Sequence, residues 1–157
     1  MKLFTGSLVV FAGVVSAPIT VSTKPAQKAP AADYRNDPRS QALRRFFQKA
    51  DCPAQHYSDV FLEAADNNDL DWRLLPSLSF IESTGGKAAR GNNLFGWDSG
   101  RAEFPTPIAG IHTVGYFLSH SYLYKDKDLD TVLATYNPNA DYAGKVKSVM
   151  RQIAPAE

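Results

Sequence analysis

The sequence predicts a mainly α-helical (α+β) domain with one small β-hairpin. Three observations support this fold class. From residue 39 onward apolar residues recur at helical spacing, polar or glycine-rich clusters separate these stretches, and one short segment departs from the helical period. The stretches amount to about six helices. With 157 residues, 44% hydrophobic and 21% charged, the chain has the size and composition of one globular domain with a short appendage.

The first 17 residues have the pattern of a signal peptide or an N-terminal anchor. Lys2 precedes an uncharged apolar run that ends at Ala17 in small residues, as signal-peptidase sites do. The run is shorter than the about 20 residues that span a bilayer, and Pro18 is unfavourable directly after a cleavage site. An uncleaved anchor and a buried N-terminal strand are therefore the alternatives. We expect an exported protein, located in the periplasm or cell envelope or secreted.

The lone Cys52 points mildly the other way, because free thiols are more typical of reducing compartments. A small apolar residue buried beside a helix end explains it equally simply.

Residues 18–38 are rich in Pro, Ala, Lys and Thr and are expected to form an extended linker, because such a composition cannot bury apolar surface. The globular domain is expected over residues 39–157. Its first helix carries a short apolar stripe between residues 43 and 47. Its second carries a longer stripe between residues 57 and 65, at intervals of three and four residues.

A third helix is expected after Asp71, whose side chain can cap it, and continues through an apolar stripe to Glu82. The Thr-Gly-Gly sequence at 84–86 ends it. Residues 92–104 change character, because two short segments flank an Asp-Ser-Gly sequence, and Gly100 suits the left-handed position of a three-residue hairpin loop. Helical spacing then returns over residues 108–122, 129–136 with Asp128 as the cap, and 142–153.

Glu82 is the most informative polar residue. It follows Leu75 by seven residues and Leu78 by four, so it projects from the apolar stripe of its helix. Partial removal from water favours the protonated form of a carboxyl group, as a general acid near neutral pH requires. An ordinary helix-end glutamate, exposed or paired with Lys87 or Arg90, fits the same spacing. Periodicity alone therefore leaves both interpretations open.

Motifs on both sides of Glu82 resemble the lysozyme-like superfamily. They are the sequences IESTGG at 81–86, NNLFGW at 92–97 and ATYN at 134–137, and the Tyr-x-x-x-Val spacing of Tyr142 and Val146. Bacterial β-N-acetylglucosaminidases and lytic transglycosylases place the catalytic glutamate at a similar helix end, before a hairpin with an Asn-Leu-Phe-Gly-like segment. The match covers roughly residues 57–153 in the expected order and is nearest to the glucosaminidases.

The resemblance implies a lysozyme-like helical fold and an enzyme that cleaves β-1,4 bonds of peptidoglycan glycan strands with Glu82 as general acid. It places Tyr136 in the cleft as a second catalytic residue, although a core tyrosine fits that position too. Five further residues are expected to stack on sugar rings, bind acetamido groups or line the site: Asn93, Phe95, Trp97, Asn137 and Tyr142. Turn, core and helix-end roles are the structural alternatives for them.

The second carboxylate of such an enzyme is not fixed by the sequence. A two-carboxylate glycosidase needs a partner about 5 to 9.5 Å from the acid, and Asp98 and Glu103 are the candidates. Asp98 also fits a turn-capping role, and Glu103 an exposed strand position. Without such a partner, the substrate acetamido oxygen or the muramic-acid 6-hydroxyl would act as the nucleophile.

Other function classes find less support. His56, His112 and His120 lack metal-ligand spacing, so no metal site is expected. A net charge of +1 gives no electrostatic basis for nucleic-acid binding. No cofactor and no transmembrane partner are expected, and the oligomeric state leaves no trace. The alternatives to a glucosaminidase are a lytic transglycosylase or muramidase of the same superfamily, or a non-catalytic glycan-binding relative.

Overall fold

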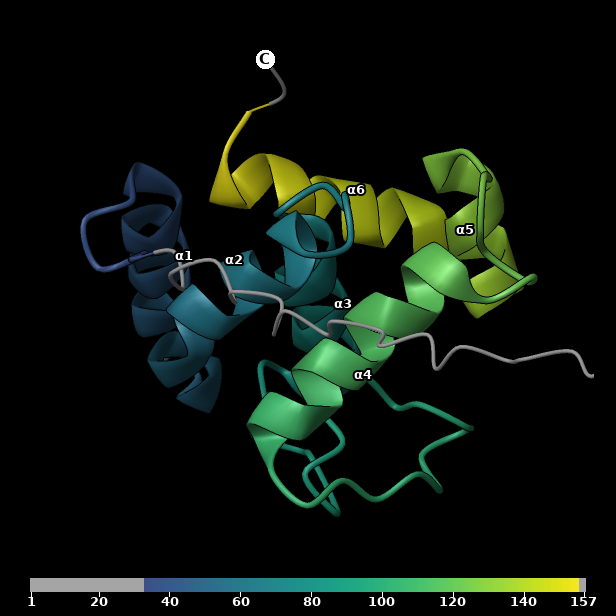
Figure 1. The fold of residues 1–157 in the computed structure, drawn as a ribbon, viewed down its shortest axis with the longest axis horizontal. Coiled ribbons are helices and arrows are strands. Elements are labelled where there is room, and N and C mark those ends of the chain that lie inside the picture. The colour runs from purple at the N-terminus through teal and green to yellow at the C-terminus, as the bar shows by residue number, and fades with distance from the viewer. Residues whose placement is uncertain (1–32, 156–157) are drawn as a thin grey trace, which may run out of the picture. The chain divides into compact units, whose positions relative to one another are not determined.

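The computed structural model describes residues 33–155, which form six α-helices and one short 3₁₀-helix (Figure 1). These are α1 (Pro38–Lys49), η1 (Pro53–Tyr57), α2 (Ser58–Asp66), α3 (Leu74–Ser83), α4 (Pro107–His120), α5 (Leu129–Tyr136) and α6 (Tyr142–Ile153). The predicted mainly α-helical fold is thus confirmed. The predicted signal or anchor segment, 1–17, and residues 18–32 of the predicted linker lie outside the described residues.

Helix α3 lies in the centre of the domain. Seven of its ten residues are buried, and it packs against α6 and α2, while α2 also packs against α4. In Figure 1, α6 runs across the top of the domain with α3 below it. Within residues 33–155, no helix combines the length and the apolar character that crossing a membrane requires.

Three phenylalanine rings tie the helices to the segment that follows α3. Phe47 of α1 stacks on Phe61 of α2 with ring centroids 5.8 Å apart, and Phe61 meets Phe95 edge to face at 6.4 Å. All three are fully buried. Burying each ring contributes about 1.5–3 kcal/mol, so this row holds the segment around Phe95 against α1 and α2.

The packed domain begins before residue 39. Tyr34 is buried, and its hydroxyl donates a hydrogen bond to Asp66 at the end of α2 (3.0 Å). Asp37 caps α1 by accepting a hydrogen bond from the Arg39 backbone N–H (2.8 Å). The last residues of the predicted linker therefore belong to the fold.

The two predicted helix caps have different outcomes. Asp128 accepts a hydrogen bond from the Thr131 backbone N–H (2.8 Å) and caps α5, as expected. Asp71 does not cap α3, which begins at Leu74. The Asp71 carboxylate instead binds the backbone N–H and the guanidinium group of Arg73 (2.9 and 2.6 Å), which occupy both of its oxygens.

The predicted hairpin at 92–104 is not confirmed. This part of the described chain is a succession of turns, and its pairing is limited to an isolated antiparallel bridge between Arg90 and Asn93. Asn92, Asp98 and Ser99 all have positive φ. Left-handed residues turn the chain and interrupt an extended ladder, so the two short segments that flank Asp-Ser-Gly form a compact loop rather than paired strands.

Cys52 occupies the junction between α1 and η1. It has no exposed surface, and the turn after α3 passes close to it at Gly85, which has a positive φ. A Cβ at residue 85 would lie 2.8 Å from Cys52 Cβ, so only glycine fits there. Burial raises the pKa of the Cys52 thiol. These observations agree with the interpretation of Cys52 as a small buried apolar residue.

Candidate functional site

Glu82 lies in the last turn of α3 and is half-buried. The helix ends at Ser83 because Thr84, its C-cap, adopts the left-handed conformation with φ of 53°. Tyr142, the first residue of α6, donates a hydrogen bond from its hydroxyl group to Glu82 Oε1 (2.6 Å). Sixty residues apart in the sequence, these two side chains meet because α6 packs along α3.

Ser83 fixes the segment that covers the end of α3. Its hydroxyl donates to the Leu94 carbonyl (2.8 Å) and accepts from the Gly86 backbone N–H (3.0 Å). The hydroxyl is therefore connected to both the turn that leaves the helix and the loop that returns to it. This arrangement brings Gly96 against the Glu82 carboxylate.

Gly96 lies next to Glu82 Oε2, the carboxylate oxygen that makes no hydrogen bond among residues 33–155. A Cβ at position 96 would lie 2.8 Å from Glu82 Oε2, closer than real Cβ atoms come to a neighbour. Its φ of +59° also favours glycine. The absence of a side chain at residue 96 lets the loop pack closely against Oε2.

Asn93 holds the loop in shape and has no amide group free for a ligand. Its Nδ2 donates to the Trp97 and Ala102 carbonyls (both 3.0 Å), and its Oδ1 accepts from the backbone N–H groups of Phe95 (3.3 Å) and Trp97 (3.0 Å). The side chain is buried. The predicted role of Asn93 in binding acetamido groups is not supported, because its amide is buried and is already hydrogen-bonded to the backbone of the loop.

A cluster of three aromatic side chains, Trp97, Tyr136 and Tyr142, lies beside Glu82. The Tyr136 and Tyr142 rings stack in parallel with centroids 6.0 Å apart, and Trp97 leans on Tyr136 at 5.8 Å. Trp97 and Tyr136 line a pocket of about 430 Å³ together with Gly96, Asp98, Ser99 and Tyr124. Trp97 is partly exposed, so its predicted stacking on a sugar ring stays possible in this geometry and stays a prediction. Phe95 cannot stack on a sugar ring, because it is fully buried.

The two tyrosine hydroxyls have different partners. Tyr142 donates to Glu82, whereas Tyr136 donates to the Phe95 carbonyl (2.6 Å). Burial, reinforced by the negative charge of Glu82, raises the pKa of both phenols well above the ordinary value. Both phenols are neutral near pH 7, as an ordinary tyrosine is, and the raised pKa keeps them hydrogen-bond donors to higher pH as well. Tyr142 is the residue that touches the candidate acid, and Tyr136 contributes its ring and fixes the loop.

Asp98 and Glu103 occupy different surroundings. Asp98 lines the aromatic pocket, and a hydrogen bond from Arg101 (2.7 Å) lowers the pKa of its carboxyl group. Glu103 lies with its aliphatic part against Gly91. Of the two carboxylates that the sequence left open, Asp98 is the one that shares a pocket with Gly96 and Tyr136.

Asn137 follows α5 and is half-buried, with its Oδ1 accepting a hydrogen bond from the Asn139 backbone N–H (3.0 Å). Its Nδ2 makes no hydrogen bond among the described residues. Within the described residues, only the oxygen of the Asn137 amide is hydrogen-bonded, to the turn between α5 and α6.

The sequence reasoning did not single out Gly96, Ser83 or Tyr124 as site residues. Gly96 and Ser83 lie within the quoted motifs, next to Phe95 and Glu82, so their signal was present but not used. Tyr124 lies in the turns after α4, and nothing in its sequence neighbours indicates that it reaches the pocket.

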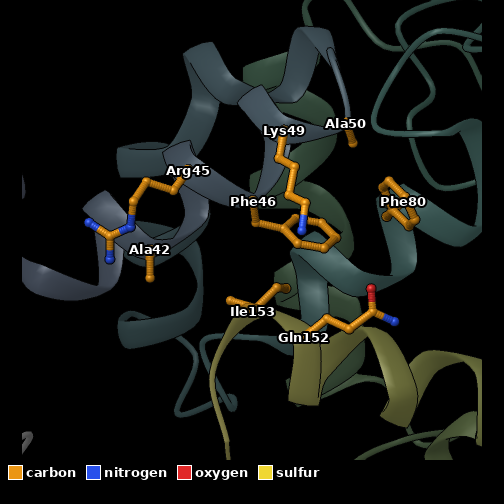
Figure 2. A pocket seen from close by; sticks show the side chains of 8 residues that line it. All are labelled: Ala42, Arg45, Phe46, Lys49, Ala50, Phe80, Gln152 and Ile153. Atoms are coloured by element: carbon orange, nitrogen blue, oxygen red, sulfur yellow. The ribbon is translucent and has the colours of Figure 1, made fainter.

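A second pocket lies on another face of α3. It has a volume of about 510 Å³ and is lined by residues of α1, α3 and α6 (Figure 2). In Figure 2, Phe46 and Phe80 flank the hollow, with Lys49 above it and Gln152 below. Phe80 and Glu82 are two residues apart on α3 and so point to nearly opposite sides of the helix. This pocket is therefore separate from the Glu82 site.

Residues 33–155 contain no group of three or more His, Cys, Asp or Glu side chains arranged to hold a metal ion. No model of a known protein family matches the chain. No curated protein matches it either.

Proposed function

We propose that the protein is a peptidoglycan glycosidase of the endo-β-N-acetylglucosaminidase type, with Glu82 as the general acid. The observation that carries the proposal is the geometry of one carboxyl group. Glu82 Oε1 is held by the Tyr142 hydroxyl, while Oε2 faces a glycine at the rim of an aromatic pocket. In this proposal the bond to Oε1 orients the carboxyl group, and Oε2, which makes no hydrogen bond among the described residues, exchanges the proton with the ligand.

The proposed step starts with protonated Glu82. Its Oε2 proton passes to the glycosidic oxygen as the bond to the anomeric carbon breaks, so the leaving sugar departs as an alcohol. Tyr142 keeps its proton during this step, and its hydrogen bond to Oε1 stabilises the carboxylate that forms. The positioned donor keeps Oε2 directed toward the substrate.

The sugar ring is proposed to lie in the pocket beside Gly96. The faces of Trp97 and Tyr136 carry negative π density, and the C–H groups of a pyranose ring suit such a surface. The polar rim at Asp98 and Ser99 can hydrogen-bond hydroxyl and acetamido groups.

The partner for the anomeric carbon is proposed to be Asp98, since it lines this pocket and Arg101 keeps its carboxyl group ionised. An ionised carboxylate is what a nucleophile or base on the second side of the ring requires. If Asp98→Asn retains activity, the substrate's own acetamido oxygen or 6-hydroxyl takes this role.

The wall substrate implies that the protein works outside the cytoplasm. The apolar segment between Lys2 and Pro18, with its small residues at the end, supports export to the periplasm, the cell envelope or the medium.

Glu82→Gln tests the proposed function, because it preserves the shape of the side chain and removes the acid. We expect lysis of purified cell walls to fall by about 10²–10⁴-fold. Glu63→Gln is the matched control, since Glu63 is a partly exposed residue of α2 that faces His112 rather than the pocket. An E82Q protein that releases sugars at the parent rate contradicts the proposal.

Mass spectrometry of the digested wall distinguishes the related activities. A hydrated glucosamine reducing end identifies a glucosaminidase, a hydrated muramic end a muramidase, and an anhydro-muramic end a lytic transglycosylase. Wall binding without any new chain ends would identify a non-catalytic glycan-binding protein instead.

A further inference from the structure

Helix α4 carries two neighbouring aromatic side chains that are exposed. Tyr116 has a relative exposure of 55% and Phe117 of 42%. Exposed aromatic residues that adjoin one another commonly mark a binding surface. Most other large rings of the described domain are buried or half-buried, so these two side chains call for a physical explanation.

The exposed rings form a row with His120. Tyr116 meets Phe117 edge to face with centroids 6.2 Å apart, and it stacks on His120 in parallel at 4.2 Å and 10°. His120 Nδ1 lies 3.1 Å from the Tyr116 carbonyl, which fixes the imidazole ring. We call Tyr116, Phe117 and His120 the α4 aromatic row. Its rings are held in place by one another, so little side-chain entropy is lost when a ligand covers them.

The α4 aromatic row is continuous with the candidate site. Phe117 stacks on Trp97 with centroids 5.8 Å apart and 26° between the ring planes. Trp97 contacts Tyr136, whose ring stacks on Tyr142, the residue that binds Glu82. An unbroken series of ring contacts thus leads from the candidate acid, past the pocket, to the exposed surface of α4.

We propose that the α4 aromatic row binds the part of a polysaccharide strand that extends beyond the pocket, so that the protein prefers long glycan chains to short ones. This inference rests on the proposed function, because it takes a glycan as the ligand. The pocket of about 430 Å³ holds only a small part of a polymer. Trp97 also contacts Tyr124 and Tyr136, but these two line the pocket, so Phe117 is the ring that continues from Trp97 away from the pocket and would carry the next sugars.

The chemistry of the row suits a neutral polymer with apolar faces and polar edges. Ring faces accept the C–H side of a sugar, and the Tyr116 hydroxyl and the His120 imidazole offer hydrogen bonds beside them. The row contains no lysine or arginine, the side chains with which an amphipathic helix attracts anionic lipid. A glycan strand therefore fits it better than a membrane surface.

The test compares a disaccharide and a hexasaccharide of β-1,4-linked N-acetylglucosamine by calorimetric titration. Both titrations use the full chain with Glu82→Gln, so that binding is measured without turnover. We expect the hexasaccharide to bind about tenfold more tightly than the disaccharide, as one additional ring contact supplies. In Tyr116→Ala this preference is expected to fall to less than about twofold, whereas Tyr116→Phe keeps it, because the ring remains.

Tyr122→Ala is the matched control. Tyr122 is 87% exposed and follows α4 closely, but it makes no ring contact within the described part of the chain. We expect it to keep the full preference for the hexasaccharide. Equal affinities for both oligosaccharides in Glu82→Gln alone, or an equal loss when Tyr122→Ala or Tyr116→Ala is added to it, would overturn the inference. Tyr116-dependent binding to phosphatidylglycerol vesicles, with glycan binding unchanged, would also overturn it and assign the row to a membrane.

The two proposals fail in different ways. If the parent protein releases no wall fragments but binds long oligosaccharides through Tyr116, the enzyme assignment fails and the glycan surface stands. If wall fragments are released while chain length has no effect on affinity, the enzyme assignment stands and the α4 aromatic row has no role in glycan binding.

Discussion

The two pockets described above differ more in their walls than in their size. The pocket in Figure 2, at about 510 Å³, is the larger, and the pocket beside Gly96 measures about 430 Å³. The first is walled by regular helices, α1, α3 and α6. The second is walled by turns and by aromatic rings from three distant segments. The comparison teaches that two pockets of similar volume can differ in their walls, and that the smaller one contains Gly96, the residue that contacts the Glu82 carboxylate.

Backbone conformation separates the two regions as well. Between Thr84 and Gly100, nine residues have positive φ, and four of them are not glycine: Thr84, Asn92, Asp98 and Ser99. The residues that line the pocket of Figure 2 are helical or adjoin helices. Left-handed non-glycine residues cost free energy and persist where the surroundings hold them. Here Ser83 and Asn93 supply the hydrogen bonds that hold the loop.

Among the substitutions that test the difference between the two pockets, Gly96→Ala should lower the rate of wall lysis most. The new Cβ would lie 2.8 Å from Glu82 Oε2, so either the loop or the carboxylate must move. A displacement of about 1 Å at a reacting group can cost about 10²-fold in rate, and we expect a loss of that order in wall lysis. The rate of release of soluble glycan fragments measures it.

Gly100→Ala provides the control for backbone strain. Gly100 also has a positive φ, but a Cβ there would meet nothing within 4 Å. It should lower the free energy of unfolding by about 1 kcal/mol and leave the rate close to that of the parent. If both alanine variants lose activity equally, crowding of Glu82 is not the cause.

Tyr142→Phe should have an intermediate effect. It removes the hydrogen bond to Glu82 Oε1 without changing the volume of the side chain. A hydrogen bond to a charged group is worth about 1.5–3 kcal/mol, so we expect kcat to fall by at least about tenfold. Tyr136→Phe removes a bond to the Phe95 carbonyl instead and should mainly lower the thermal stability.

Steady-state kinetics on a soluble glycan, together with thermal unfolding, separate the two tyrosines. A fall in kcat that is larger for Tyr136→Phe than for Tyr142→Phe would show that the loop, rather than the donor on the carboxylate, limits the reaction.

Arg45→Ala with Lys49→Ala should have the smallest effect. Both cations line the pocket of Figure 2, and neither forms an ion pair within the described residues. Exposed charges away from a site change stability by less than about 0.5 kcal/mol. We expect wall lysis within about twofold of the parent at low and at moderate salt. A larger loss would mean that the two regions act on the same substrate.

The helices could be predicted because they follow from local patterns. The stripe through Val146, Val149 and Ile153 is buried in α6, and Asp128 caps α5 as its position indicates. The end of α3 at residues 84–86 was likewise visible in the sequence. Helical periodicity and turn residues are local features, so residues close in the sequence are enough to predict them.

The loop and the roles of its residues could not be predicted in the same way. The two segments that flank Asp-Ser-Gly suggested a hairpin, but Asn93 and the left-handed residues fold residues 92–104 into a compact loop. Phe95 was expected to face a ligand and instead joins Phe61 in the core. Which side of a loop faces inward depends on distant partners, and no local pattern records them.

The hydrogen bond between Glu82 and Tyr142 is another feature that no local pattern in the sequence predicts. Periodicity indicated that Glu82 leaves the apolar stripe, and the motif at the start of α6 suggested that Tyr142 belongs to the site. Only the packing of α6 on α3 shows that the two residues share a hydrogen bond.

The closure of Gly85 over Cys52 has a practical consequence. The only thiol of the chain is fully buried, and burial raises its pKa, so the reactive thiolate is scarce while the domain is folded. Labelling by a thiol reagent then requires the turn after α3 to open. Cys52 is thus a natural single-site reporter of how often the end of the helix that carries Glu82 comes apart, and it needs no engineered cysteine.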